Sequence, residues 1–256
     1  MQIRENKAKK ILDAGGFVVT SSVRLPEPGL CEILGYAGFD LVVIDGEHGA
    51  MDPSSLDRLT QSCYASDTVP LYRVLKNNDP EDIMRALDLG VQGIVLPHCR
   101  TADDARGLQR AAFYAPRGAR GFGPGRGTRW GRVPARGDYF ERANETILLT
   151  ALVEDVEGVE NIDEIAAAGL DVLWAGTGDL AVDYGVPGER DHAKVKEAAS
   201  RILEACQRHK VAAGYPARSI EEAQWAREQG YRAIGYGGAE GYVMEQSRQF
   251  LDSLDR

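Results

Sequence analysis

Two carboxylates stand directly after apolar runs of the sequence and could bind a divalent metal ion. Glu154 ends the run ILLTALVE, and Asp179 follows the run DVLWAG through a glycine-containing turn. If these runs are neighbouring parallel strands, both side chains lie at the same end of the sheet. Two carboxylates without a CxxC motif or a histidine pair nearby favour a hard ion that prefers oxygen ligands, such as Mg²⁺ or Mn²⁺. Each acid could equally cap a neighbouring helix.

An aspartate and a histidine spaced three residues apart could transfer protons. Asp45 closes the run LVVID, and His48 follows it. A carboxylate this close in sequence can orient the imidazole and raise its basicity, which is the usual arrangement of a general base. A structural histidine with satisfied hydrogen bonds is the alternative. Glu47 and His98 also follow apolar runs and are further polar candidates.

Arg73 interrupts the otherwise apolar run PLYRVL. A guanidinium inside a buried strand needs an anionic partner to offset its desolvation. That partner could be a substrate carboxylate held by two hydrogen bonds, or it could be Asp45 or Glu47 in a structural ion pair. Arg73 is therefore a candidate for binding an acidic substrate.

These residues are embedded in a regular alternation of strand-like and helix-like segments. Nearly continuous apolar runs predict strands that are buried on both faces, as in parallel sheets. The runs are 16–21, 40–45, 71–75, 93–97, 147–154, 171–176, 211–215 and 232–236. The clearest helical patterns are 79–89, 101–112, 156–168, 191–208 and 219–229. About eight strand–helix repeats in 256 residues predict an α/β fold, the (β/α)8 or TIM barrel, rather than an open doubly wound sheet.

The segment 114–144 is too long for an ordinary connection between a helix and a strand. Its run GFGPGRGTRWG lacks the GxGxxG form after a strand, and no Lys-Ser or Lys-Thr pair follows it. Dinucleotide or P-loop binding is therefore not expected. We expect an active-site flap or a subunit contact that makes Arg120, Arg126 and Arg129 available to anions near the barrel mouth.

Composition narrows the possible partners. The chain has 30 basic and 39 acidic residues, a net charge of −9, and 43% apolar residues. Because no run is rich in lysine and arginine, neither nucleic acid nor a membrane surface is an expected partner. The N-terminus has no apolar leader, and no 18 apolar residues run together, so we expect a cytoplasmic protein with one domain over residues 1–256. The four cysteines are isolated and are expected to be buried thiols.

Several segments together resemble the HpcH/HpaI aldolase family, metal-dependent class II pyruvate aldolases of the pyruvate-kinase-like barrel superfamily. They are FDLVVIDGEHGAMD (39–52), PLYRV (70–74), DLGVQGIVLP (88–97), YAPRGARGFG (114–123), RWGR (129–132), LVE (152–154) and GTGDLAVDYGVPG (176–188). The resemblance extends over nearly the whole chain.

This resemblance implies a function and a role for each candidate residue. It implies a divalent metal, Mg²⁺, Mn²⁺ or Co²⁺, held by Glu154 and Asp179. It further implies enolisation of a 2-oxo acid by the pair His48 and Asp45, and recognition of its carboxylate by Arg73. The expected reaction is the reversible aldol cleavage of a 4-hydroxy-2-oxo acid into pyruvate, or a related 2-oxo acid, and an aldehyde.

Three positions depart from the family pattern. Leu152 stands where many members have glutamine, the usual GPxDL motif reads GTGDL at 176–180, and glycines 237–238 stand where members often have aspartate. The metal ligands are retained. We expect Leu152, Thr177 and Gly178 to contribute to the substrate site and to alter the preference for the donor.

Two other functions remain as alternatives. The same metal-stabilised enolate would serve oxaloacetate decarboxylation or a thioester cleavage like that of citrate-lyase β-type proteins, and Leu152 gives this alternative some weight. The chain is shorter than expected for a CoA-ester lyase, which argues against the thioester cleavage. A non-catalytic barrel that binds oxo acids is the third possibility, against which the retained set of charged residues argues.

The C-terminal segment 239–254 is expected to form a helix with an apolar stripe of Tyr242, Val243, Phe250, Leu251 and Leu254. The resemblance implies that this last helix is exchanged between protomers of a homo-oligomer, a hexamer or a trimer. The alternative is that the helix covers its own barrel.

Overall fold

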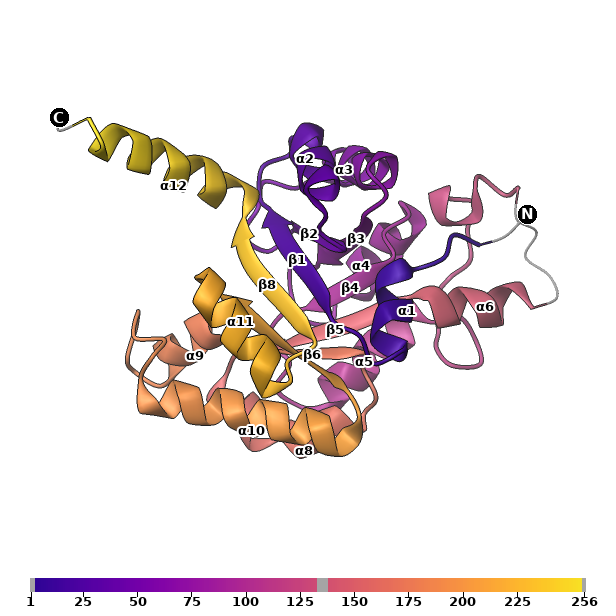
Figure 1. Cartoon of the computed structure of the whole chain (residues 1–256). Helices are drawn as coiled ribbons and strands as arrows, with labels where there is room; N and C mark the ends of the chain where they lie inside the picture. The colour runs from indigo at the N-terminus through magenta and orange to yellow at the C-terminus, as the bar shows by residue number, and fades with distance from the viewer. Residues whose placement is uncertain (1–2, 133–137, 255–256) are drawn as a thin grey trace.

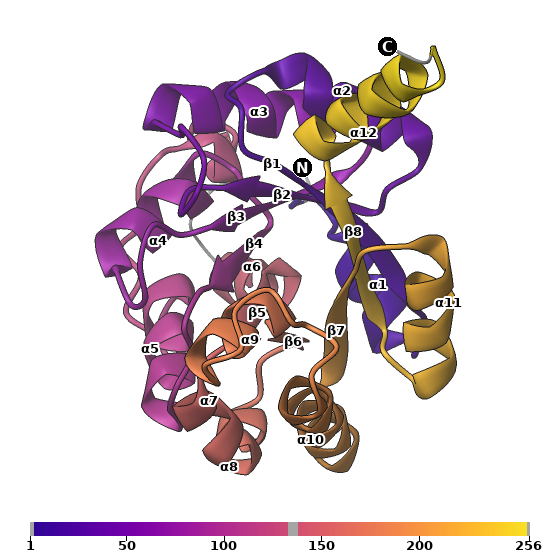
Figure 2. The same cartoon turned by 90° about the vertical axis from the view of Figure 1, so that its left-hand side faces the viewer.

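The structure, a computed structural model, describes residues 3–132 and 138–254. Each strand pairs in parallel with the next strand in sequence, and β1 pairs with β8, so the sheet closes into a barrel. Figure 2 looks toward the carboxyl ends of the strands, with the helices outside the ring. The predicted TIM barrel is confirmed. The strands are β1 (Val18–Val23), β2 (Leu41–Asp45), β3 (Val69–Arg73), β4 (Gly93–Leu96), β5 (Leu148–Val153), β6 (Val172–Ala175), β7 (Ala212–Ala217) and β8 (Ala233–Gly238).

The helices of the described ranges lie mostly on the outside of this barrel, and the last one projects away from it (Figure 1). They are α1 (Lys7–Asp13), α2 (Pro28–Ala37), α3 (Pro53–Ala65), α4 (Pro80–Asp88), α5 (Ala102–Ala112), α6 (Tyr139–Thr146), α7 (Val156–Glu160), α8 (Ile162–Ala167), α9 (Thr177–Asp183), α10 (Ala193–His209), α11 (Ile220–Gln229) and α12 (Ala239–Asp252), with a short 3-10 helix at Arg126–Thr128. Thr101 and Asp104 form a capping box at the start of α5. The single helix predicted over 156–168 is wrong, because the chain breaks at Asn161 into α7 and α8. No helix of the described ranges is long and apolar enough to span a membrane.

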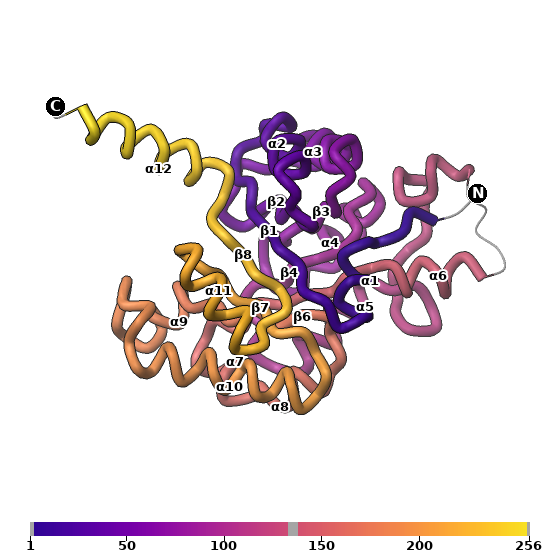
Figure 3. Tube along the Cα trace, in the orientation of Figure 1, coloured from indigo at the N-terminus to yellow at the C-terminus, as the bar shows by residue number. Residues whose placement is uncertain are grey.

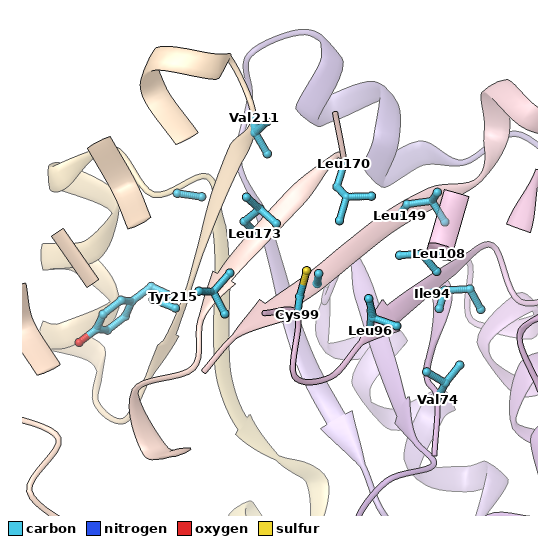
Figure 4. Close-up of a cluster of buried hydrophobic side chains, with 14 of the residues drawn as sticks. Val74, Ile94, Leu96, Cys99, Leu108, Leu149, Leu170, Leu173, Val211 and Tyr215 are labelled. Carbon is cyan, nitrogen blue, oxygen red and sulfur yellow. The ribbon is translucent and has the colours of Figure 1, made fainter. Parts of the chain in front are cut away.

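Apolar side chains form two layers of core, one on each side of the strands. The inner layer fills the barrel and includes Leu41, Leu71, Val95, Leu148 and Trp174. The outer layer lies between strands and helices; Figure 4 shows part of it, including Ile94, Leu96, Leu108, Leu149 and Leu173. Because successive side chains of a strand point to opposite layers, both faces must be apolar. This requirement explains the unalternating runs of the sequence.

The described parts of the long segment, residues 114–132 and 138–144, lie at the amino-terminal end of the barrel, away from the carboxyl ends of the strands (Figure 1). It connects the end of α5 to the start of β5, and both lie at that end. Arg120 pairs there with Asp88 at 2.6 Å, and Arg126 pairs with Asp57 at 2.8 Å. The expectation that this segment is a flap bringing Arg120, Arg126 and Arg129 to the chain's own barrel mouth is therefore wrong. Residues 133–137 lie outside the described ranges.

The last helix, α12, leaves the barrel at the carboxyl end of β8 and projects away from it (Figures 1 and 3). Only its beginning packs on the barrel: the ring of Tyr242 stacks on Tyr236 at 5.9 Å and on Phe39 at 6.4 Å. The remainder carries exposed apolar side chains, namely Val243, Met244, Phe250, Leu251 and Leu254. The alternative that this helix covers its own barrel is therefore wrong.

Candidate active site

A buried ion pair occupies one side of the barrel mouth. Asp45 ends β2, and the register of the sheet places it opposite Arg73 at the end of β3. Arg73 donates from Nε to Oδ1 of Asp45 at 2.9 Å and from Nη2 to Oδ2 at 2.5 Å, while Nε of Arg24 donates to Oδ2 at 3.1 Å. Burial opposes the charge of Asp45, but the hydrogen bond and the charge of Arg73 outweigh it and hold the pKa of Asp45 below its usual value.

His48 lies at the solvent edge of this network. Oδ1 of Asp45 accepts the backbone N–H groups of Glu47 and His48, each at 3.2 Å. The His48 side chain is 58% exposed, and its recorded acidic neighbour is Glu47, at 3.7 Å. Asp45 therefore fixes the loop that carries His48, and the recorded contact between the two residues is made through the backbone. The same Glu47 carboxylate lies 3.0 Å from Nη1 of Arg73.

The two carboxylates predicted to bind a metal come from the neighbouring strands β5 and β6. Glu154 follows β5 and is 3% exposed, whereas Asp179, in the first turn of α9 after β6, is exposed. A Cβ atom on Gly176 would lie only 2.3 Å from Cβ of Glu154, so this close approach of the two chain segments requires glycine. Burial raises the pKa of Glu154 to about 7, and the charges of Asp179 and Glu47 add to this effect.

His98 joins Glu154 in a way that the sequence pattern did not reveal. It follows β4 with a positive φ of 50°, and this backbone turn directs its N–H to Oε1 of Glu154 at 2.8 Å. Its ring Nδ1 lies 3.1 Å from Asp155, which also pairs with Arg100 at 3.0 Å. Burial opposes the protonation of His98, but the charges of Glu154 and Asp155 raise its pKa above the usual value. The only signal in the sequence is a histidine placed after an apolar run.

The residues at this site fit a hard divalent ion. Among the side chains of the described ranges, no group of three or more His, Cys, Asp or Glu is arranged to hold a metal. Mg²⁺ needs no such group, because it commonly binds one or two carboxylates and keeps water or substrate as its other ligands. Within residues 3–132 and 138–254, the Glu154 carboxylate accepts one hydrogen bond, from the N–H of His98, and it faces two further acids. That donor set suits an oxygen-preferring cation.

A cavity of about 950 Å³ opens at the same end of the barrel. Asp45 and Arg73 lie on one wall, and Val95, Leu152 and Trp174 form an apolar part of the lining. Leu152 is therefore placed where a substrate can reach it. The other two residues expected at the substrate site form the first turn of α9: Thr177 is buried, and Gly178 lies beside the Arg190 guanidinium.

A closed parallel barrel with charged side chains at the carboxyl ends of its strands is the architecture of TIM-barrel enzymes. The chain belongs to the HpcH/HpaI aldolase/citrate lyase family, whose model matches residues 23–244. It is 31% identical to a 5-keto-4-deoxy-D-glucarate aldolase of an Enterobacter species over 98% of this chain and 97% of the relative. It is 35% identical to a 4-hydroxy-2-oxovalerate aldolase of Rhodococcus jostii over 84% of this chain and 82% of the relative.

Solved structures agree with this assignment. The crystal structure of a family protein from Burkholderia cenocepacia superposes with a TM-score of 0.92 at 30% identity, covering 98% of this chain and 100% of that one. The chain is therefore a carbon–carbon lyase of the aldolase class, as the sequence predicted, rather than a non-catalytic barrel.

Proposed function

We propose that the protein uses a divalent metal to catalyse the reversible aldol cleavage of a 4-hydroxy-2-oxo acid into pyruvate, or a related 2-oxo acid, and an aldehyde. The observation that carries this proposal is the buried Glu154 carboxylate, whose pKa is raised to about 7 beside Asp179 and Glu47. Glu154 and Asp179 would hold Mg²⁺, Mn²⁺ or Co²⁺. When bound, such an ion supplies Lewis-acid stabilisation of the negative charge that develops on the oxo acid.

Arg73 would bind the carboxylate of the 2-oxo acid. Of the five N–H donors of its guanidinium, two are bonded to Asp45 and one points toward Glu47. Two donors therefore have no acceptor among the described residues, and Arg73 lines the cavity, where a substrate carboxylate would accept from them. The pairing with Asp45 keeps the planar guanidinium group in one orientation, so the side chain loses less conformational entropy when the substrate binds.

Proton transfer at the carbon next to the oxo group would fall to His48, held at the mouth by the Asp45 loop. His98 is a second candidate, because its ring lies 3.7 Å from Glu154 and is oriented by Asp155. The two histidines follow different strands, β2 and β4, and both lie near the Glu47 carboxylate, at 3.7 Å from His48 and 3.5 Å from His98.

Exchange of the pyruvate methyl protons in deuterated water tests the shared enolisation step without an aldehyde. We expect exchange that depends on added Mg²⁺ or Mn²⁺, is suppressed by a chelator, and is lost in Glu154→Ala and Asp179→Ala. A panel of 4-hydroxy-2-oxo acids, with one and with two carboxylates, then tests cleavage. Absence of both exchange and cleavage at saturating metal would refute the proposal.

Oxaloacetate decarboxylation is the second candidate, favoured by one observation. Leu152 lines the cavity with an apolar side chain, so a donor carboxylate that leaves as CO₂ would meet a less polar wall. Incubating the protein with oxaloacetate and no aldehyde separates the two reactions. Decarboxylation that is faster than every aldol cleavage of the panel would make this second candidate the main activity.

We also propose a homo-oligomer in which α12 packs on a neighbouring barrel. Tyr242 packs on the chain's own barrel, but the apolar side chains that follow it, Val243, Met244, Phe250, Leu251 and Leu254, are exposed. A groove of about 210 Å³ remains on the outside of the barrel beside α11, lined by Phe17, Val19, Ile220, Ala223, Gln224, Arg227, Ile234 and Tyr236. Light scattering should show a trimer or hexamer for the full chain and a smaller mass after truncation before Ala239. A full-length chain that is monomeric at micromolar concentration would contradict the exchange. The cytoplasmic location and the single domain over 1–256 stay predictions.

A further inference from the structure

A glutamate at the start of α12 anchors the chain at the carboxyl end of β1. Oε1 of Glu240 accepts the backbone N–H of Arg24 at 2.6 Å and that of Leu25 at 2.9 Å. Gly238 makes this approach possible, because a Cβ atom there would lie 2.9 Å from Oγ of Ser22 and 3.3 Å from Oε2 of Glu240. Glu240 belongs to the first turn of α12, so its side chain ties the base of this helix to the barrel mouth.

Arg24 in turn contacts the chain on both sides of the loop 46–50, which carries His48. Before the loop, Nε of Arg24 donates to Oδ2 of Asp45 at 3.1 Å. At the end of the loop, the carbonyl oxygen of Arg24 accepts the N–H of Ala50 at 3.1 Å. Because the loop is short, a shift of Arg24 also displaces the exposed side chain of His48.

We propose that Glu240 is a positioning residue for the proton-transfer step. It acts through Arg24, whose place at the mouth determines where the loop presents His48 to the carbon next to the oxo group. This inference rests on the proposed function, in which His48 moves that proton. The role depends on position rather than charge: within residues 3–132 and 138–254, Glu240 accepts backbone N–H groups and forms no ion pair with the guanidinium of Arg24.

Binding of the donor and of the metal should depend little on Glu240. Arg73 keeps its two hydrogen bonds to Asp45 when Arg24 shifts, and the proposed metal ligands come after β5 and β6. The proposal therefore predicts a lower rate at saturating pyruvate with little change in the pyruvate concentration that gives half of that rate. A general loosening of the mouth would change both quantities.

Two conservative variants separate position from charge. Glu240→Gln keeps the length of the side chain and an oxygen that can accept both N–H groups, whereas Glu240→Asp keeps the charge but is shorter by one carbon–carbon bond. Glu228→Asp is the matched control, because Glu228 is exposed on α11 and does not line the cavity. Exchange of the pyruvate methyl protons in deuterated water at saturating Mg²⁺ gives the maximal rate and the half-saturating concentration for each protein. Light scattering gives the mass of each.

We expect Glu240→Asp to lower the maximal rate about ten- to a hundredfold, the effect of a displaced proton-transfer group, and to change the half-saturating concentration less than about threefold. Glu240→Gln should keep most of the rate, and Glu228→Asp should match the wild type. Amide hydrogen exchange in the metal-free protein gives a second readout. The loop 46–50 should exchange faster in Glu240→Asp than in the wild type or in Glu240→Gln.

Three results would overturn the role of Glu240 and leave the aldolase proposal standing. The first is a maximal rate of Glu240→Asp equal to that of the wild type, and the second is a loss in Glu240→Gln as large as that in Glu240→Asp. The third is a loss of rate that a higher half-saturating concentration or a smaller mass accounts for in full. If the wild type itself exchanges no pyruvate protons at saturating metal, the enolisation step of the proposed function fails, and this inference fails with it.

Discussion

Replacing Glu154 by glutamine should change the pH dependence of stability in the metal-free protein. Glutamine keeps the shape and still accepts the N–H of His98, but it cannot ionise. In the native protein the pKa of Glu154 is about 7, against 4.5 for an unperturbed glutamate. Between these values the folded state keeps a proton that the unfolded state has lost, so the free energy of unfolding falls as the pH rises.

The size of this fall follows from the shift. One pKa unit corresponds to about 1.4 kcal/mol, so from pH 5 to pH 8 the wild type should lose about 2–3 kcal/mol relative to Glu154→Gln. Urea denaturation with a chelator present, at steps of half a pH unit, measures this difference. The exposed Glu160→Gln on α7 is the control and should follow the wild type. A difference between wild type and Glu154→Gln that stays constant with pH would refute the reasoning.

Three other variants or conditions test the remaining contacts. The apparent affinity for Mn²⁺, measured by calorimetry, should fall about tenfold for each pH unit below pH 7, because a proton competes with the metal for Glu154. An affinity that does not change between pH 7.5 and pH 5.5 would exclude this competition. Arg73→Ala should lower the free energy of unfolding by up to about 3–5 kcal/mol, the cost of a buried charge without a partner, because the buried Asp45 carboxylate then keeps Arg24 alone of its two arginine partners. Arg24→Ala removes a half-exposed partner and should cost clearly less; equal losses in urea denaturation would contradict the assignment. Removal of the catalytic base should slow the exchange of pyruvate protons by about 10²–10⁴-fold. Comparing the exchange rates of His48→Ala and His98→Ala therefore identifies the base. If both variants exchange protons at the wild-type rate, neither histidine is the base.

The barrel itself was predictable because burial on both faces leaves a strong mark on a strand. The runs 40–45 and 93–97 match β2 and β4 within one residue at each end. The third strand begins at Val69, two residues before the predicted start, because Pro70 lies within it although proline is unusual inside a sheet. The break at Asn161 left no comparable signal, since apolar residues continue at helical spacing across it.

Site residues at strand ends were predictable as a set, but their partners were not. The sequence placed Asp45, Arg73, Glu154 and Asp179 at one mouth, because strands that are parallel must end together. Which acid faces Arg73 depended on the register between β2 and β3, and the contact of His98 with Glu154 depended on a left-handed backbone. The arginines of segment 114–144 show the same limit, because their partners Asp57 and Asp88 are distant in sequence.

The balance of charge at the mouth gives an independent reason for a divalent cation. Asp45 pairs with Arg73 and Arg24, Glu47 also pairs with Arg73, and Asp155 pairs with Arg100. With Glu154 and Asp179, five carboxylates stand against these three arginines, an excess of two negative charges. The ring of His98 faces both Glu47 and Glu154 and adds one positive charge when it is protonated. An incoming 2-oxo acid adds one more negative charge to a region that is already negative, so its binding here is unfavourable without added positive charge. The metal-free protein reduces this excess by keeping a proton on Glu154 up to about pH 7. A divalent ion would replace that proton, because both bind to the Glu154 carboxylate. The pKa of Glu154 and the affinity for the metal must therefore change together in any variant that alters Glu47, Asp179 or His98.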